Sequence, residues 1–272
     1  MAGRGENAEA ETWYRRAATA GDTDAMTGLG VLLARRGEKA EAETWYRRAA
    51  TAGDTDAMTG LGVLLARRGE KAEAETWYRR AATAGNTDAM FNLGLLLARR
   101  GENAKAETWC RRAATAGDTS AMNNLAVLLT RRGENAEANA WRRRAADAGD
   151  TSAMNNLAVL LTRRGNNAEA ETWCRRAADA GNTGAMYNLG VLLARRGENA
   201  EAETWYRRAA DAGNTGAMYN LGVLLARRGE NAEAETWYRR AADARHASAM
   251  NRLAALDAET VAWRRFARKS DV

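Results

Sequence analysis

The sequence predicts an all-α fold, an α-solenoid in which antiparallel helix pairs repeat every 32 residues. Regularly placed glycines separate 15-residue stretches rich in Ala, Leu, Glu and Arg, which are strong helix formers, and the 272 residues include no proline. No alternation typical of a β-strand occurs. Self-similarity at a fixed period of this size is typical of stacked helical units. The period is defined by eight tryptophans: Trp13, Trp45, Trp77, Trp109, Trp141, Trp173, Trp205 and Trp237.

Each repeat is expected to hold two helices joined by tight turns. A glycine such as Gly53 follows each helix, at the place where a left-handed residue commonly ends one. The side-chain oxygen of Thr55 or Asn103 is expected to cap the start of the next helix. Lys39 and Lys71 replace that asparagine in two copies.

The two ends of the array differ from its interior. The chain should begin with a lone helix of the second type at about residues 8–20, followed by seven full pairs. A degenerate capping helix is expected at about 248–269, because the stretch MNRLAALDAETVAWRRFARK contains neither glycine nor proline. Its basic residues would supply the polar cap that solenoids need. We therefore predict one solenoid domain over residues 1–272.

The second helix of each pair carries the tryptophan. Ala42, Trp45 and Ala49 follow helical spacing and form an apolar stripe that we expect in the core. The position after the tryptophan varies, from Tyr46 in one copy to Arg142 in another. Because Arg142 must reach solvent, we expect this position to lie on a flanking surface in every copy.

The first helix of each pair keeps one side constant and varies another. The constant side, which we expect to be buried, comprises Ala25, Met26, Leu29, Leu32 and Leu33 in the first full copy. The substitutions form one stripe along the helix, because their spacing places them on a common face. This confinement fits a ligand-binding wall, and it also fits neutral drift on a solvated face. The stripe ends in a row of arginines: Arg35, Arg67, Arg99, Arg131, Arg163, Arg195 and Arg227.

The motif AMYNLGVLLARRG followed by AEAETWYRRAADAG resembles the Sel-one-like branch of the tetratricopeptide repeats. The resemblance covers residues 8 to about 256, with a shorter turn and without the proline common at repeat ends. It implies a right-handed superhelix of helix pairs, with the first helix of each pair on the concave wall. It also implies that asparagines and basic residues on that wall hold an extended peptide.

The residues at the matching positions are candidates for contacts with such a peptide. A carboxamide can donate to a peptide carbonyl and accept from its N–H, and arginine can bind a carboxylate through two parallel bonds. The candidate asparagines and arginines are Asn92, Asn124, Asn156, Asn188, Asn220, Arg131, Arg163, Arg195 and Arg227. On the same stripe, Phe91, Tyr187 and Tyr219 would offer flat apolar contacts, and Asp24 and Asp56 would favour a basic residue at the other end. The predicted partner is a charge-polarised protein segment or peptide.

Other kinds of site lack the residues that they require. The single histidine, His246, replaces a turn residue, and no serine has a histidine positioned to activate it. We find no phosphate-binding loop, no paired metal-binding cysteines and no dinucleotide fingerprint. The sequence therefore predicts a protein that is not an enzyme and that has no catalytic site, cofactor or metal site.

Two alternatives to a peptide-binding scaffold stay open. The net charge of +6 would suit a nucleic-acid-binding solenoid, but the excess is spread thinly along the chain. Asp24, Asp56 and Asp88 on the variable stripe would repel phosphate, so nucleic acid ranks below peptide. The uniform copies also fit a consensus-like repeat scaffold with no dedicated ligand.

The expected location is the cytoplasm of a bacterium. The N-terminal MAGRGENAEAETW has no apolar run, so we expect neither a signal peptide nor a membrane span. Cys110 and Cys174 stand two repeats apart, about 20 Å by helix packing, which is too far for a disulfide. Free thiols fit a reducing compartment. The composition, rich in Ala, Arg and Gly, favours a bacterial source, and we expect a monomer or weak homo-oligomer.

Overall fold

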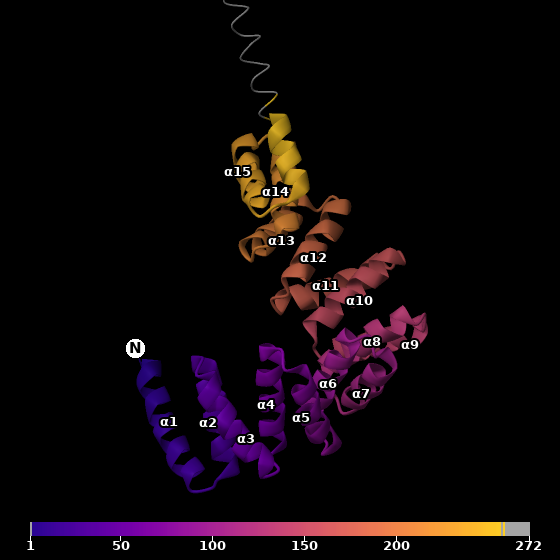
Figure 1. The fold of residues 1–272 in the computed structure, drawn as a ribbon. Coiled ribbons are helices and arrows are strands. Elements are labelled where there is room, and N and C mark those ends of the chain that lie inside the picture. The colour runs from indigo at the N-terminus through magenta and orange to yellow at the C-terminus, as the bar shows by residue number, and fades with distance from the viewer. Residues whose placement is uncertain (1, 257, 259–272) are drawn as a thin grey trace, which may run out of the picture. The chain divides into compact units, whose positions relative to one another are not determined.

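The computed structural model describes residues 2–256 and 258, and over these residues every regular element is an α-helix (Figure 1). Up to residue 147 the helices are α1 (Ala2–Thr19), α2 (Thr23–Arg36), α3 (Lys39–Thr51), α4 (Thr55–Arg68), α5 (Lys71–Thr83), α6 (Thr87–Arg99), α7 (Asn103–Thr115), α8 (Thr119–Arg131) and α9 (Asn135–Asp147). They continue as α10 (Thr151–Arg163), α11 (Asn167–Asp179), α12 (Thr183–Arg195), α13 (Asn199–Asp211), α14 (Thr215–Arg227) and α15 (Asn231–Asp243). Residues 247–256 are also helical.

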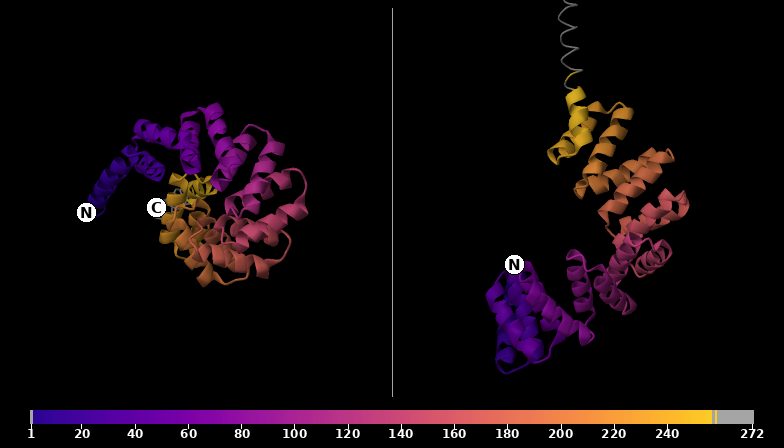
Figure 2. Two further views of the ribbon diagram at one scale, coloured as in Figure 1. Left: turned by 90° about the horizontal axis from the view of Figure 1, so that it is seen from below. Right: turned by 45° about the vertical axis from the view of Figure 1, so that its right-hand side comes forward.

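The chain divides into two compact units, residues 1–145 and 146–272. Within each unit, a helix packs mainly on the next helix along the chain and weakly on the one after it (Figures 1 and 2). A chain whose contacts are so local is a solenoid, and the predicted all-α solenoid class is confirmed. The description of residues 1–272 as one domain stays a prediction.

The ends of the array agree in part with the expected half-repeat and cap. α1 covers the lone helix expected at residues 8–20 but begins already at Ala2. The helix expected at 248–269 is present from 247 to 256, and residues 257 and 259–272 lie outside the described part of the chain.

The first helix of each pair is capped by the residue before the threonine. Asp54 has extended backbone, and its carboxylate accepts a hydrogen bond of 2.7 Å from the Ala57 N–H. Thr55 is therefore the first helical residue, and the expectation that it caps was wrong. The expected cap Asn103 was wrong too, since α7 begins after Glu102, whose side chain makes no capping bond. The glutamate is instead free to pair with basic side chains.

Left-handed residues end the helices as expected. After α2, Gly37 has φ 90°, and the next N–H donates to the Leu33 carbonyl at 3.0 Å, which is the Schellman arrangement. Near the end of the array Arg245 takes the glycine position with φ 63°. His246 then caps the last helical stretch, since its Nδ1 accepts from the Ala249 N–H at 3.3 Å.

The constant side of the first helices forms the core. Ala25, Met26, Leu29 and Leu33 are buried as predicted, whereas Leu32, in the first pair, is half-buried. Six of the repeated tryptophans, such as Trp45, join this core, whereas Trp109 is half-buried.

The tyrosine after the tryptophan is buried in α3, α5, α13 and α15, so the expectation of a flanking surface was wrong for these copies, although Tyr14 of α1 is 39% exposed. Tyr46 is only 5% exposed, and its ring lies between Gly30 on α2 and Gly60 on α4. A Cβ on Gly30 would come within 2.7 Å of the ring, so glycine is what lets the helix approach it. Arg142 occupies the same position differently, because its guanidinium extends to the Thr130 hydroxyl at 2.6 Å. The presence of Arg142 in one copy therefore did not indicate whether this position is exposed in the other copies.

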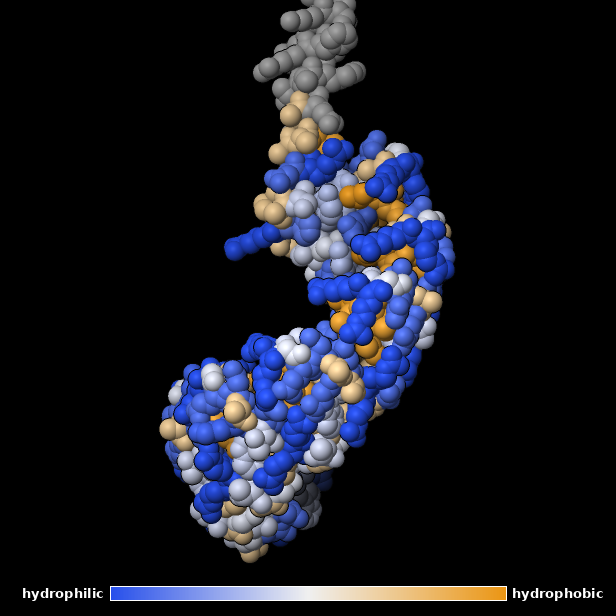
Figure 3. All heavy atoms as spheres, turned by 90° about the vertical axis from the view of Figure 1, so that its right-hand side faces the viewer, coloured by the Kyte–Doolittle hydropathy of each residue, from blue (hydrophilic) through white to orange (hydrophobic). Residues whose placement is uncertain are grey.

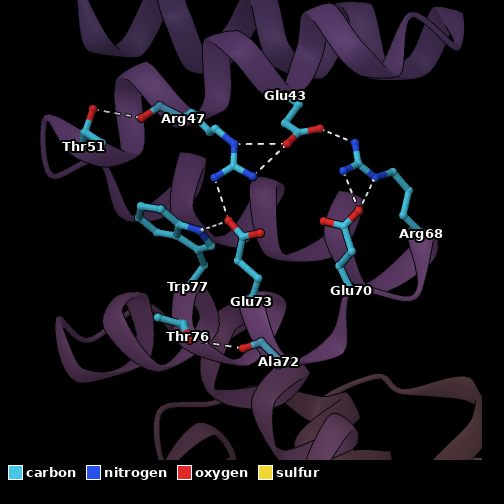
Figure 4. Close-up of polar contacts among 9 residues, drawn as sticks. All are labelled: Glu43, Arg47, Thr51, Arg68, Glu70, Ala72, Glu73, Thr76 and Trp77. Carbon is cyan, nitrogen blue, oxygen red and sulfur yellow. Dashed lines mark hydrogen bonds and ion pairs between the residues drawn. The ribbon is translucent and has the colours of Figure 1, made fainter.

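A ladder of glutamates and arginines links successive second helices (Figure 4). Glu43 accepts from Arg47 of its own helix and from Arg68 at the end of α4. Arg47 in turn donates to Glu73 of the next repeat at 2.6 Å. Equivalent bonds recur in other copies, such as Arg207 to Glu233 at 2.7 Å. These pairs are partly exposed, so each contributes modestly to the free energy of unfolding.

We expect this ladder to make the stability sensitive to acid. The Arg47 hydrogen bond holds the pKa of Glu73 below its ordinary value of 4.5, and Arg175 acts likewise on Glu201. Because the folded pKa is the lower one, the stabilisation is complete above about pH 4.5 and is lost as the pH falls through the folded pKa. The melting temperature should therefore fall below about pH 4.5, by the sum of these modest contributions. A Glu73→Gln/Glu201→Gln variant should show a shallower fall, and a wild-type melting temperature unchanged down to about pH 3 would contradict this account.

Candidate ligand-binding groove

Two consecutive arginines stand at the C-terminal end of each first helix, from α2 to α14. The surroundings of the two side chains differ. The second arginine of the pair is bound to glutamate in most copies, as Arg228 is to Glu203 at 2.5 Å and to Glu230 at 2.8 Å. The first arginine is exposed and forms no hydrogen bond or ion pair within the described residues. We call these seven the groove arginines: Arg35, Arg67, Arg99, Arg131, Arg163, Arg195 and Arg227.

Five of the groove arginines line cavities beside the first helices: Arg35, Arg99, Arg131, Arg195 and Arg227. In the second unit, a cavity of about 470 Å³ lies between α12 and α14, with Tyr206 of α13 at its floor. Arg195, Arg227 and Asn220 contribute polar groups, as do Asn199 and the glutamate-paired Arg228, and Val191 is among its apolar residues. The upper part of Figure 3 shows apolar surface between hydrophilic side chains on one face of this unit.

The first unit holds two cavities at equivalent positions. One, of about 590 Å³, is lined by Tyr14, Gly28, Val31 and Arg35. The other, of about 240 Å³, is lined by Cys110, Asn124, Arg99 and Arg131 among others. The residues of these cavities correspond to those beside Tyr206 after shifts of six and three repeats, so the solenoid reproduces one groove with altered chemistry.

The predicted asparagines lie on the first helices, but their amides differ in the hydrogen bonds that they already make. Asn92 donates to the Asp88 carbonyl of its own helix at 2.9 Å, and Asn188 donates to Asn155 at 2.8 Å. Asn220 contacts the Tyr206 hydroxyl at 3.4 Å. Asn124 makes no hydrogen bond through its side chain within the described residues, and Asn156 is exposed.

The predicted aromatic residues are half-buried by neighbouring rings. Tyr187 lies 6.3 Å from Tyr206 between ring centroids. Tyr219 lies 5.7 Å from Tyr238 and stacks on His246 at 5.0 Å. These rings thus contribute to packing between helices. Phe91 is half-buried at the corresponding place in the first unit.

The predicted acidic positions both lie at the surface of the first unit. Asp24 is exposed, and Asp56 accepts a hydrogen bond of 2.7 Å from the Asn86 amide. The carboxylate of Asp56 is therefore engaged with a neighbouring repeat, which leaves its second oxygen for another donor.

Burial keeps the groove floor neutral. It raises the pKa of Tyr206 to about 12 and that of the Cys110 thiol to about 11. Near neutral pH the phenol is therefore protonated, and the cysteine behaves as a small apolar residue rather than as a thiolate. Cys110 and Cys174 are both free and buried.

The sequence analysis missed the floor residues Tyr206, Cys110 and Gly94. A signal was present in the repeats themselves, because Gly190 and Tyr206 stand 16 residues apart and the same combination recurs with Tyr46, Tyr78 and Tyr238. In contrast, Ala158 accompanies Cys174. Such a pairing indicates contact between the two positions.

The described residues offer neither a metal site nor a membrane-spanning helix. No group of His, Cys, Asp and Glu side chains there has an arrangement that could hold a metal ion. No helix in that part of the chain is both long and apolar enough to cross a membrane.

Comparison with known proteins agrees with this architecture. Tetratricopeptide repeat profiles match residues 2–57, 53–89, 84–121, 119–147, 151–180, 181–217 and 214–249. No curated protein matches the sequence significantly. A Sel1 repeat protein from Oxalobacter formigenes is 28% identical with a TM-score of 0.69, and the match covers 80% of this chain and 99% of that one.

Two further structures extend the comparison. The structure of c5321, a protective antigen of uropathogenic Escherichia coli strains that displays an SLR fold, is 27% identical with a TM-score of 0.68. The match covers 88% of this chain but only 57% of that antigen. Yeast Tom70, 15% identical, shares the fold with a TM-score of 0.60 over 95% of this chain and 59% of its own. Repeats of this kind generally form non-catalytic protein-interaction scaffolds. With profile matches over most of its length and these solved relatives, the chain belongs to the tetratricopeptide repeat family as a Sel1-like helical repeat protein.

Proposed function

We propose that this protein is a non-catalytic scaffold that binds acidic protein segments in extended form along the first helices of its repeats. The observation that carries the proposal is the row of groove arginines without carboxylate partners. In a chain with 35 acidic residues, the neighbouring arginine row is almost entirely paired. A cation left without a partner beside an apolar cavity is suited to a carboxylate of a ligand.

The asparagines support the same role. Asn124 and Asn220 each line a cavity beside two groove arginines, and an amide there can bond to the ligand backbone. Asp24 and Asp56 favour a basic residue of the ligand near the first repeats. The unpaired cysteines support a reducing compartment such as the cytoplasm.

A display library of random peptides would test the proposal. We expect enrichment of peptides with net negative charge, and the enriched peptide is then the probe. Arg195→Gln/Arg227→Gln should weaken its binding at least about tenfold, because two charge-assisted hydrogen bonds are lost. Arg175→Gln/Arg196→Gln removes the same charge from glutamate-paired arginines outside the cavity lining, and should change the affinity by less than about twofold.

The same measurements can reject the proposal. Absence of any enriched peptide, or equal losses in the two double variants, would show that the groove arginines are not the binding groups. Single-stranded poly-uridine RNA that displaces the peptide, with a steep dependence of affinity on salt, would instead indicate a nucleic-acid-binding solenoid.

A further inference from the structure

One repeat departs from the pairing of glycine and tyrosine at the groove floor. Where the tyrosine is replaced by Arg142 or Cys174, the glycine 16 residues earlier is replaced by Ala126 or Ala158. The added methyl group partly fills the space that the ring would occupy. Cys110 is the exception, because its partner is still a glycine, Gly94. The α6–α7–α8 repeat therefore lacks both the ring and the compensating methyl.

The cavity at this place is smaller than its equivalent in the second unit, about 240 Å³ against about 470 Å³, but its lining extends to the floor glycine. Gly94 itself lines it, whereas Gly190 does not line the cavity above Tyr206. The Cys110 sulfur covers Gly94 closely, since a Cβ there would lie 2.6 Å from it. The cysteine side chain ends at this sulfur and is shorter than a tyrosine ring. Tyr206 reaches Asn220 with its hydroxyl, but the corresponding Asn124 has no such partner.

The walls and rim of this cavity specify what could fill it. Leu95, Val127 and Leu128 make the walls apolar, and the volume of about 240 Å³ exceeds the roughly 150 Å³ that accommodates benzene in a protein core. At the rim, Arg99 and Arg131 form no ion pair within the described residues. The site therefore combines space for a ring, an amide at the position of a phenol hydroxyl, and two uncompensated positive charges.

From this combination we infer that the Gly94–Cys110 cavity binds a tyrosine or phenylalanine side chain flanked by acidic residues of a peptide. The ligand ring takes the place of the missing tyrosine, and its neighbouring carboxylates pair with Arg99 and Arg131. A tyrosine hydroxyl would bond to the Asn124 amide, as Tyr206 does to Asn220. This inference rests on the proposed function and adds the residue that anchors the ligand.

Two blocked peptides and one small molecule serve as probes in calorimetric titrations. The peptides are Glu-Glu-Tyr-Glu-Glu and Glu-Glu-Ala-Glu-Glu, and the small molecule is p-cresol, which is the tyrosine side chain alone. The tyrosine peptide should bind at least about tenfold more tightly than the alanine peptide, and p-cresol should compete with it.

Substitutions at the floor then locate the site. Cys110→Tyr should fold, because Gly94 leaves the room that Gly62 leaves for Tyr78, and it should abolish the preference for the tyrosine peptide. Cys110→Ala keeps the cavity open and should preserve the preference. Tyr206→Cys recreates the vacancy beside Gly190, between Arg195 and Arg227, and should add a second site for the same peptide.

The possible outcomes separate this inference from the proposed function. If the two peptides bind equally and Cys110→Tyr changes nothing, the aromatic anchor is wrong while acidic-peptide binding stands. If neither peptide binds, the inference is wrong and the proposed preference for acidic segments loses its support. Binding of p-cresol alone would identify the cavity as a small-molecule site and would also overturn the inference. Should Cys110→Tyr fail to fold by circular dichroism, the gain or absence of a second site in Tyr206→Cys decides the question.

Discussion

Replacement of Trp77 with alanine is expected to lower the free energy of unfolding of residues 1–145 by about 3–5 kcal/mol. Trp77 is 9% exposed in the interior of the first unit, and its indole N–H donates to Glu73 at 3.4 Å. The Arg80 guanidinium lies 4.8 Å from the ring. Removal of the side chain therefore leaves a cavity and also breaks polar contacts. Guanidinium titration followed by far-ultraviolet circular dichroism would measure the change.

Trp13 is a matched control for this experiment. It occupies the equivalent position in α1, and it is 59% exposed. Trp13→Ala should therefore cost much less than Trp77→Ala and should affect only the end of the array. In a solenoid an interior defect weakens the coupling of its neighbours, so the Trp77→Ala transition should also broaden or split. Equal losses for the two variants would contradict this account of the packing.

Gly62→Ala is expected to destabilise the protein by about 1–3 kcal/mol, although alanine is the better helix former. The added Cβ would lie 2.6 Å from a ring carbon of Tyr78, which is 3% exposed and has little room to shift. The steric conflict therefore outweighs the gain of about 1 kcal/mol in helix propensity. Thermal unfolding of the single variant would measure the net effect.

A double-mutant cycle would test the origin of that effect. Tyr78→Cys removes the ring and is destabilising in the wild-type background. In the Gly62→Ala background it should cost less, because alanine and cysteine already coexist at Ala158 and Cys174. A coupling energy of about 0.5–3 kcal/mol in favour of the double variant is expected. Additive losses would show that the two positions do not constrain each other.

Local patterns in the sequence were sufficient for the fold and for the helix that carries the groove. Helical spacing placed Met26, Leu29 and Leu33 in the core, and the confined substitutions identified the first helix as the variable wall. Local reasoning misplaced the helix caps, although Asp54 before Thr55 could have been recognised, since aspartate is a favoured N-cap. It also misplaced Tyr46, because exposure was inferred from the single substitution Arg142.

The candidate site was predictable only in outline. Periodicity assigned Arg67 and Arg68 to one helix end, but it could not tell that the second is paired and the first is not. That difference depends on Glu43, which belongs to the preceding second helix and lies 25 residues earlier in the chain. Likewise, Gly94 lines its cavity because α7 places no ring over it, whereas Gly190 beside Tyr206 does not.

The sequence by itself determined the 32-residue period, the helix pairs, the apolar core and the helix that bears the variable stripe, because each of these follows from spacing along a single helix. Only the tertiary structure decided which arginine of a pair is left without a carboxylate, that the tyrosine is a buried spacer, and where its replacement by cysteine brings the floor glycine into the lining of a cavity. These features arise from distances between neighbouring repeats, and such distances are set by how closely glycine lets the helices pack.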